Sequence, residues 1–306
     1  MTSSAFPFAF FNKKFVKTEE AKVSIMTNAL QYGNGVFDGI RGYYRNKKIF
    51  VFRLDLHLER FQNALKIIGV TIPYSTSQLK KIIIDLIRKN RPNTDCYIRP
   101  FAYAGSVNTK PNLDQDEIFN FCIYMITMGE YLPTKVGVSA MVSSWRRISD
   151  NAIPARAKIS GAYINSSLAK KEATDRGFTE AIVLNECGHV TEGSASNFFI
   201  VKNSILITPL ITDDIVEGVT RRTIIELAKA LNIQVNERTV DRTEIYTADE
   251  AFFTGTGVQL SWINKIDKRI ISNGKRGKIT GLLQDLFFQI VYGENKKYSQ
   301  EWCTTV

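Results

Sequence analysis

Histidine is scarce in this chain of 306 residues, which contains only His57 and His189. No HExxH segment is present, and two imidazoles make a His-rich zinc or di-iron site nearly impossible. The four cysteines lie far apart without a CxxC pair, so the sequence predicts neither a zinc ribbon nor a disulfide framework. We therefore expect no metal site, and we interpret the cysteines as reduced thiols of a cytoplasmic protein.

Long apolar runs are also lacking. Segments such as 118–126 are interrupted and about ten residues long, which is too short to span a bilayer. The first fifteen residues lack the charged-then-apolar pattern of a signal peptide. We therefore expect neither a membrane partner nor export.

Acidic residues are the minority charge, with 30 Asp and Glu against 40 Lys and Arg, which gives a formal net charge of +10. This excess permits anionic partners without identifying one. A nucleic-acid module would need a basic stripe with interleaved aromatics, and the densest basic segment, 265–278, is more typical of a turn between two strands. No GxxxxGK[ST] segment is present. A solvated basic surface is the simpler interpretation, and we expect no nucleic-acid partner.

The composition, 44% apolar and 23% charged, is that of a globular protein, and the length suggests two domains. Hydrophobic spacing predicts a strand over 48–52, a helix up to Gly69 with Asp55 as its N-cap, and a second helix capped by Ser75 or Ser77. Further expected strands are 97–104, 117–126, 138–144, 180–184, 197–201 and 205–207, with others near Gln234 and Ala251; further expected helices are 162–176, 219–231 and a closing helix over 279–291.

The pattern breaks at 129–137, where Gly and Pro flank a short polar segment. We expect a small N-terminal domain over 1–128, a linker over 129–137 and a larger domain over 138–306. Strands and helices follow one another without strict βαβ alternation, which favours the α+β class.

Without metal ligands or a histidine base, the chemistry must come from Lys, Tyr, Glu, Thr or a cofactor. Two segments suit a phosphate. Residues 217–222 (EGVTRR) open an amphipathic helix, whose free N–H groups and dipole attract anions. Residues 254–257 (TGTG) follow an apolar strand, and their glycines permit close backbone approach to an anion. An ordinary helix cap and a tight turn explain the same patterns.

Lys158 stands just before an expected helix among small residues, where a desolvated lysine can act as a Schiff-base nucleophile. The alternative is a surface lysine. Similarly, segment 191–197 (TEGSASN) is explained equally well as a hairpin loop with a solvated Glu192.

In combination, the segments resemble the fold type IV (class IV) pyridoxal-phosphate aminotransferases, and specifically the branched-chain amino acid aminotransferases. The likeness runs in order along the chain, through NALQYGNGVFDGIR (28–41), RLDLHLER (53–60), YIRP (97–100), SWRR (144–147), IPARAK (153–158), GAYINS (161–166), TEGS (191–194), EGVTR (217–221) and FTGTG (253–257). The resemblance implies a two-domain α+β fold, with the cofactor bound by the larger domain.

The resemblance also implies catalytic and cofactor-binding roles. Lys158 binds pyridoxal phosphate covalently and later moves the substrate proton. Glu192 sits against the pyridine nitrogen and keeps it protonated, and Tyr163 donates a hydrogen bond to the phenolic oxygen. The phosphate is held by Arg60, Val219, Thr220 and Thr256. For Arg60, an ion pair on the helix surface is the alternative.

On the substrate side, the resemblance implies an aromatic-walled pocket for aliphatic side chains, formed by Tyr32, Phe37, Tyr97 and Tyr163. Tyr97 and the backbone of Thr256 and Gly257 receive the α-carboxylate, and Arg99 meets the distal carboxylate of glutamate. Arg99 as a plain strand-surface charge is the alternative.

The chain departs from the family pattern at Gln31, Asp38, Ala195, Ser196 and Trp262, where His, Glu, Gly, Glu and Pro are usual.

The resemblance implies ping-pong transamination of L-leucine, L-isoleucine or L-valine with 2-oxoglutarate. Alternatives are a D-amino acid or (R)-amine aminotransferase, an aminodeoxychorismate-lyase-like enzyme, or a non-catalytic polyanion-binding protein. Small-molecule substrates and a homodimer or higher homo-oligomer are expected, with Tyr32 serving the partner's pocket.

Overall fold

The computed structural model describes residues 4–113 and 119–306. The chain forms two compact units. The first unit comprises Met1–Gly129, Ala157–Gly161 and Gln289–Val306, and the second comprises Glu130–Arg156 and Ala162–Phe288. The sequence placed both 157–161 and 289–306 in the later domain, because periodicity indicates which elements form but not which core they join.

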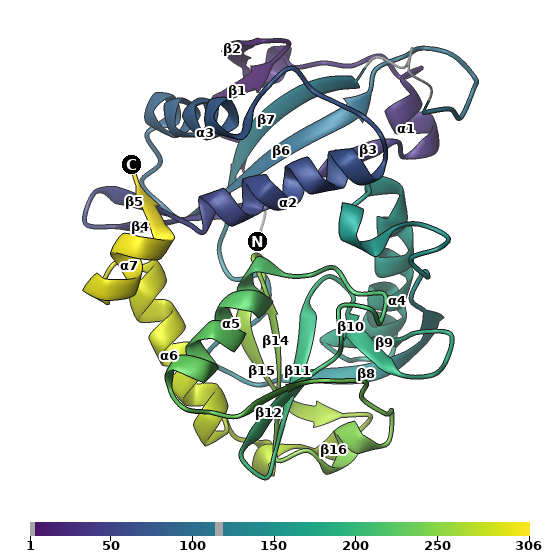
Figure 1. The fold of residues 1–306 in the computed structure, drawn as a ribbon, viewed down its shortest axis with the longest axis vertical. Helices are drawn as coiled ribbons and strands as arrows, with labels where there is room; N and C mark the ends of the chain where they lie inside the picture. Colours follow the sequence, from purple (N-terminus) through teal and green to yellow (C-terminus); the bar gives the residue numbers. More distant parts are fainter. Residues whose placement is uncertain (1–3, 114–118) are drawn as a thin grey trace. The chain divides into compact units, whose positions relative to one another are not determined.

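An antiparallel sheet with the strand order β17-β5-β4-β6-β7-β1-β2 is the centre of the first unit, and β3 pairs with β6 (Figure 1). Its strands are β1 (Phe8–Phe11), β2 (Lys14–Lys17), β3 (Gly35–Phe37), β4 (Ile40–Arg45), β5 (Lys48–Phe52), β6 (Cys96–Ala104), β7 (Phe119–Thr127) and β17 (Cys303–Thr305). The expected start of β7 at residue 117 lies outside the described residues.

Four helices accompany this sheet in the described part of the unit, α1 (Asn28–Tyr32), α2 (Leu54–Ile67), α3 (Thr76–Asn90) and α7 (Lys296–Trp302). Ser75 caps α3 through a complete capping box with Gln78. The prediction of Asp55 as the cap of α2 is wrong, because Arg53 holds that position in a left-handed conformation. Asp55 lies in the first turn, where its charge favours the helix dipole.

The core of the first unit lies between α2, α3 and the sheet. Leu58 and Phe61 of α2 and Ile83 of α3 are fully buried against Ile98 and Ile123 of the sheet. Each such side chain contributes roughly 1.5–3 kcal/mol when it leaves water. The predicted helical spacing therefore corresponds to a real apolar face on both helices.

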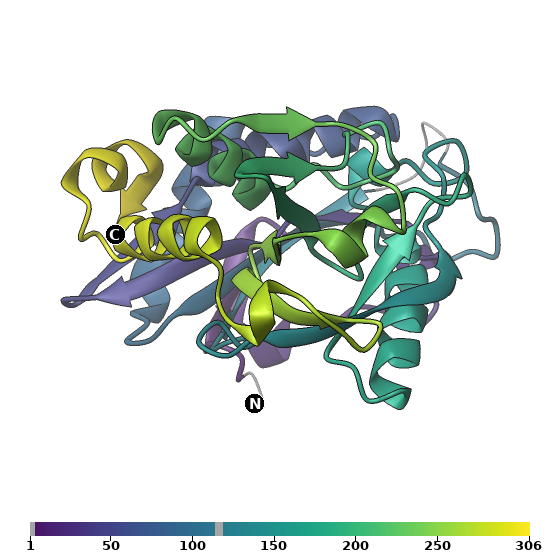
Figure 2. The ribbon, with the colours of Figure 1, turned by 90° about the horizontal axis from the view of Figure 1, so that it is seen from below.

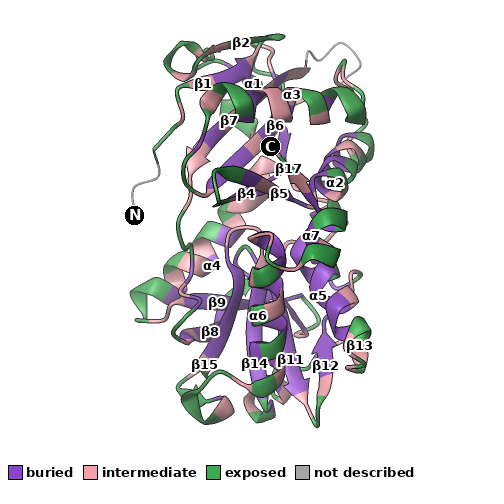
Figure 3. Cartoon of the chain, turned by 90° about the vertical axis from the view of Figure 1, so that its left-hand side faces the viewer, coloured by how far each residue is buried: buried purple, intermediate pink, exposed green. Residues whose placement is uncertain are grey.

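The second unit is built on a mixed sheet with the order β10-β9-β8-β15-β14-β11-β12-β13, to which β16 adds beside β15. Strands distant in sequence lie side by side, with teal β8 next to yellow-green β15 (Figure 2). The strands are β8 (Val138–Arg146), β9 (Glu180–Leu184), β10 (Val190–Gly193), β11 (Asn197–Lys202), β12 (Ile205–Thr208), β13 (Val235–Glu237), β14 (Glu250–Gly255), β15 (Gln259–Ile266) and β16 (Arg269–Ile270). Figure 3 shows most of the central strands as buried.

Helices α4 (Tyr163–Asp175), α5 (Val219–Ala230) and α6 (Lys278–Val291) complete the second unit, although the last residues of α6 belong to the first. The structure also has short 3-10 helices at Thr18–Glu20, Ala155–Ala157, Ser160–Ala162, Glu244–Thr247 and Ser272–Gly274. The expectation that α6 closes the chain is wrong, since α7 and β17 follow it. Both are too short and polar to produce a periodic signal. Within residues 4–113 and 119–306, no helix has the length and apolar character needed to cross a membrane.

Candidate active site

Lys158 lies in the segment that returns to the first unit, and its backbone is left-handed with φ of 48°. Such a conformation costs a non-glycine residue about 1 kcal/mol or more, and it persists only where neighbours hold it. Here Phe37 donates its N–H to the Lys158 carbonyl at 3.4 Å, and Ile159 bridges Val36. The strained backbone therefore fixes Lys158 beside β3.

Gly33 and Gly161 allow this segment to approach α1 closely. The Gly161 N–H and the Ser160 hydroxyl both donate to the Gly33 carbonyl, at 3.1 and 2.7 Å. A Cβ on Gly33, which has φ of +70°, would meet the Gly161 Cα at 2.6 Å. Glycine is required at position 33 both for its backbone conformation and for this contact.

The structure brings two candidate residues of the first unit, Lys158 and Arg99, to the ring of a third, Phe37. The Lys158 Nζ lies 5.2 Å from the ring centroid and the Arg99 guanidinium carbon 4.2 Å from it. Arg99 also donates from Nη2 to the Tyr97 hydroxyl at 3.0 Å. Both cations are within cation–π range of an aromatic wall, so Arg99 is not a plain surface charge. Tyr32 ends α1 and is exposed.

Arg60 is held by a buried carboxylate that sequence reasoning noted only as a departure from the family pattern. Its Nε and Nη2 donate to Asp38 Oδ2 and Oδ1, each at 2.8 Å. The His57 Nδ1 lies 2.8 Å from Asp38 Oδ1, and the Gly39 N–H donates to the same oxygen at 2.6 Å. The alternative of an ion pair on the helix surface is wrong, because Asp38 is 1% exposed.

Burial opposes ionisation of Asp38, but the positive charge of Arg60 and the hydrogen bonds from Arg60 and His57 outweigh it and hold the Asp38 pKa well below its usual range. Burial lowers the pKa of His57, and Asp38 only partly offsets this shift. An ionised Asp38 accepts the Nδ1 proton of a neutral His57. The sequence carried one signal for this cluster, since His57 and Arg60 stand three residues apart on one helix face.

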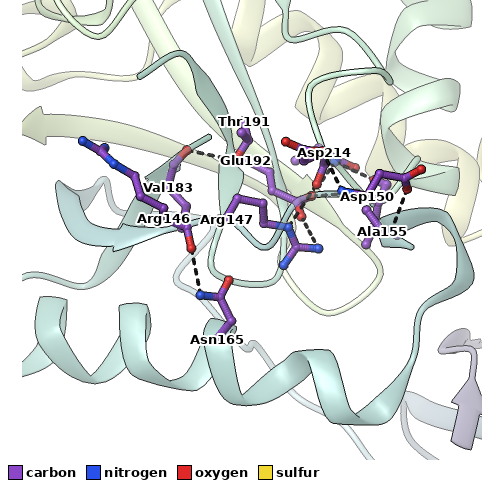
Figure 4. Close-up of polar contacts among 11 residues, drawn as sticks. Arg146, Arg147, Asp150, Ala155, Asn165, Val183, Thr191, Glu192 and Asp214 are labelled. Atoms are coloured by element: carbon purple, nitrogen blue, oxygen red, sulfur yellow. Dashed lines mark hydrogen bonds and ion pairs between the residues drawn. The ribbon is translucent and has the colours of Figure 1, made fainter. Parts of the chain in front are cut away.

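Glu192 is the central acid of the second unit. It lies on β10, is 4% exposed, and pairs with Arg147, whose Nη2 is 3.1 Å from Oε1 (Figure 4). Its Oε2 accepts from the Asn197 amide at 3.0 Å and from the Val216 N–H at 3.3 Å. The alternative of a solvated glutamate in a loop is therefore wrong. Sequence reasoning missed Arg147 as its partner, although SWRR marked the segment.

The start of α5 offers donors for an anion. Its N-cap, Gly218, makes no side-chain cap hydrogen bond, and Val219 and Thr220 are buried in the first turn. The Ser196 and Thr254 hydroxyls are also buried, without a hydrogen-bond partner. Backbone N–H groups at a helix start and free hydroxyls together suit a phosphate.

The other candidates of the second unit lie on two elements. Thr256 and Gly257 form the half-buried turn between β14 and β15, and Gly255 lies against Ser196. Tyr163 is the half-buried first residue of α4. Within residues 4–113 and 119–306, no cluster of His, Cys, Asp or Glu side chains could hold a metal ion.

Comparison with known proteins gives concordant results. A model of the family "amino-transferase class IV" matches residues 35–266. A probable branched-chain-amino-acid aminotransferase of Aquifex aeolicus is 43% identical, covering 100% of this chain and 99% of its own. The branched-chain-amino-acid aminotransferase of Escherichia coli K12 is 37% identical, covering 97% and 96%.

Solved structures agree. The branched-chain aminotransferase of Thermoproteus uzoniensis with norvaline superposes with a TM-score of 0.94 at 40% identity, covering 99% of each chain. The branched-chain amino acid aminotransferase of Thermobaculum terrenum, in its pyridoxal-phosphate form, gives 0.93 at 36% identity, covering 98% of each. The α+β fold expected from the sequence is confirmed.

Proposed function

Because the chain belongs to the class IV aminotransferases of fold type IV, we propose that it transfers the amino group of L-leucine, L-isoleucine or L-valine to 2-oxoglutarate. The products are a branched 2-oxo acid and L-glutamate, formed in a ping-pong cycle. The observation that carries this proposal is the likeness, over essentially the whole chain, to proteins named for that reaction.

The residues present fit pyridoxal phosphate as the cofactor. The uncapped start of α5 and the partnerless hydroxyls of Ser196 and Thr254 suit a phosphate, and the buried carboxylate of Glu192 suits a protonated ring nitrogen. When bound, this cofactor supplies a carbonyl that takes up amino groups and a ring that accepts electrons.

Lys158 acts in two ways in this proposal. Its amine would hold the cofactor covalently, and its free form would move the proton of the substrate's α-carbon. The left-handed backbone and the contacts of its segment with Val36 and Phe37 keep the side chain beside the Phe37 ring. A lysine fixed in this way loses little freedom when it reacts.

The remaining cofactor contacts involve three parts of the cofactor: its ring nitrogen, its phenolic oxygen and its phosphate. Glu192 would hold the ring nitrogen, and Tyr163 would hold the phenolic oxygen. The phosphate would be held by Arg60, by the α5 start at Val219 and Thr220, and by Thr256. Arg60 suits this role because Asp38 already fixes the plane of its guanidinium.

The substrate site must accept an aliphatic side chain in one half of the cycle and a carboxylate in the other. Phe37, Tyr97, Tyr163 and Tyr32 supply aromatic surface for the first demand. Arg99 meets the second, because its guanidinium rests on the rings of Phe37 and Tyr97. The backbone of Thr256 and Gly257, with Tyr97, takes the α-carboxylate.

We also propose a cytoplasmic homodimer or a multiple of one. Apolar side chains are exposed together on segment 23–30, with Ile25 at 82% and Leu30 at 65% exposure. This segment is tied to residues 104–106, since the Thr27 hydroxyl donates to the Ala104 carbonyl at 2.8 Å. An apolar patch of this kind favours association, and the adjacent Tyr32 would then serve the partner's site.

The test combines turnover with colour. The purified enzyme should be yellow with pyridoxal phosphate and should turn over L-leucine with 2-oxoglutarate, but neither D-alanine nor aminodeoxychorismate. Lys158→Ala should lose both the visible band and activity. Lys171→Ala, in an exposed i,i+4 pair with Asp175, should keep both. Turnover of only the D-substrate would identify the alternative aminotransferase, and a colourless protein with salt-sensitive polyanion binding would refute an enzymatic role.

A further inference from the structure

Arg147 is the last residue of the SWRR segment, and three polar contacts fix both its backbone and its guanidinium. It follows β8 and is buried. Its backbone N–H donates to the Leu184 carbonyl at 2.8 Å, its Nε donates to the Asp214 carbonyl at 3.0 Å, and its Nη2 lies 3.1 Å from Glu192 Oε1 (Figure 4). The guanidinium is therefore set in one orientation, with one edge against the carboxylate.

Two further carboxylates extend this arrangement. Asp214 has a left-handed backbone, with φ of 58°, and its Oδ1 accepts the Asp150 N–H at 2.9 Å. Asp150 in turn accepts the Ala155 N–H at 2.9 Å through Oδ1. The loop that presents the Asp214 carbonyl to Arg147 is thus held in place, and so is the start of the segment that leads to Lys158.

The opposite side of Glu192 is fixed by Asn197. Its amide donates to Glu192 Oε2 at 3.0 Å and to the Val216 carbonyl at 2.8 Å. Gly218 leaves the space for this amide, because a Cβ there would meet Asn197 Oδ1 at 2.0 Å. One carboxylate oxygen is therefore paired with a cation and the other with neutral donors, which determines both the rotation and the charge of Glu192.

We propose that Arg147 is the positioning residue that keeps Glu192 ionised and oriented toward the cofactor's ring nitrogen. This inference rests on the proposed function. A buried carboxylate without a cation takes up a proton, and a protonated Glu192 would no longer favour a protonated ring nitrogen. Arg147 touches Glu192 and acts only through it. A purely structural role, tying Leu184 to Asp214, is the competing explanation.

The two explanations predict different effects on cofactor binding. If Arg147 acts through Glu192, its loss weakens only a cofactor that has the ring nitrogen; if its role is structural, its loss weakens both cofactors. We would compare Arg147→Met with Arg147→Lys, using two cofactors, pyridoxal phosphate and its 1-deaza analogue, which has carbon in place of the ring nitrogen. The neighbouring Arg146 is exposed, so Arg146→Met is the matched control. Dissociation constants are measured by fluorescence titration of the cofactor-stripped enzyme, and leucine turnover is measured alongside.

Arg147→Met should bind pyridoxal phosphate roughly 10–100-fold more weakly than wild type, because a loss of this size corresponds to one hydrogen bond to a charged group. The deaza analogue should change by less than about threefold, because it makes no ring-nitrogen contact with Glu192. Arg147→Lys keeps a cation and should recover part of the affinity. Arg146→Met should match wild type with both cofactors.

Equal weakening of both cofactors in Arg147→Met and Arg147→Lys would overturn the proposal and leave Arg147 a structural role, and so would unchanged affinity for pyridoxal phosphate. If Arg147→Met does not fold, the double variant with Glu192→Gln should, because it buries no unpaired carboxylate. Failure of the double variant to fold also counts against the proposal. A wild-type enzyme that binds no pyridoxal phosphate would refute the proposed function itself.

Discussion

The guanidinium of Arg60 and the carboxylate of Asp38 form two parallel hydrogen bonds, Nε to Oδ2 and Nη2 to Oδ1, both of 2.8 Å. This two-point contact fixes the plane of the guanidinium as well as its position. Asp38 directly follows β3, so the pair ties α2 to the strand that carries Phe37. The cation expected to hold a phosphate is therefore oriented before any ligand arrives.

Replacing Asp38 with Asn should destabilise the protein and weaken its hold on the cofactor. The change leaves the half-buried guanidinium of Arg60 without its anion and removes charge-assisted hydrogen bonds, which costs about 1.5–3 kcal/mol of unfolding free energy. We expect roughly tenfold weaker binding of pyridoxal phosphate, because Arg60 is no longer oriented. Urea unfolding and a cofactor titration measure the two effects. Asp55→Asn removes an exposed pair with Lys80 and should change stability by less than about 1 kcal/mol. Unchanged cofactor affinity in Asp38→Asn would contradict a positioning role.

His57 should make stability depend on pH. Burial lowers its pKa in the folded protein, so below about pH 6.5 the unfolded chain binds a proton that the folded chain does not. The stability present above that pH is lost as the pH falls toward the folded pKa. His57→Gln should flatten the decline in melting temperature between about pH 7.5 and about pH 5.5. His189→Gln, at an exposed position, is the control. A slope in His57→Gln equal to that of wild type would show that other groups cause the decline.

Arg99 should distinguish the two substrates. Arg99→Met removes the cation expected to meet the distal carboxylate but keeps apolar bulk against Phe37. We expect KM for 2-oxoglutarate and for L-glutamate to rise roughly 10–100-fold, with KM for L-leucine within about threefold of wild type. Steady-state kinetics of both half-reactions provide the measurement, and Arg88→Met, an exposed arginine of α3, is the control. Equal loss toward both substrates would instead indicate damage to the pocket wall.

The apolar patch on segment 23–30 should govern assembly. The double variant Ile25→Asp and Leu30→Glu places two charges on that patch, and sedimentation velocity should shift toward the monomer mass. Ile270→Glu changes an equally exposed residue of β16 and should keep the wild-type mass, since Ile270 is 68% exposed outside this patch. An unaltered oligomer in the double variant would place the interface elsewhere.

Local structure was predictable from the sequence wherever hydrophobic periodicity or a capping residue indicates it directly. The apolar spacing along α3 and the capping box at Ser75 fixed that helix, because both signals act within one or two turns. The motif series around Lys158 and Glu192 led to the family, which the comparisons with known proteins then supported. The roles of the individual site residues stay predictions that the variants above test.

Only tertiary structure decided which charges meet. Asp38 and Arg60 stand 22 residues apart, and Arg147 stands 45 residues before Glu192, so no local pattern joins either pair. The sequence alone determined two arginines and two carboxylates, and it left a surface ion pair for Arg60 and a solvated loop for Glu192 as open alternatives. The fold buried the carboxylates, and burial made a cationic partner necessary, because an unpaired charge in a dry interior costs several kcal/mol.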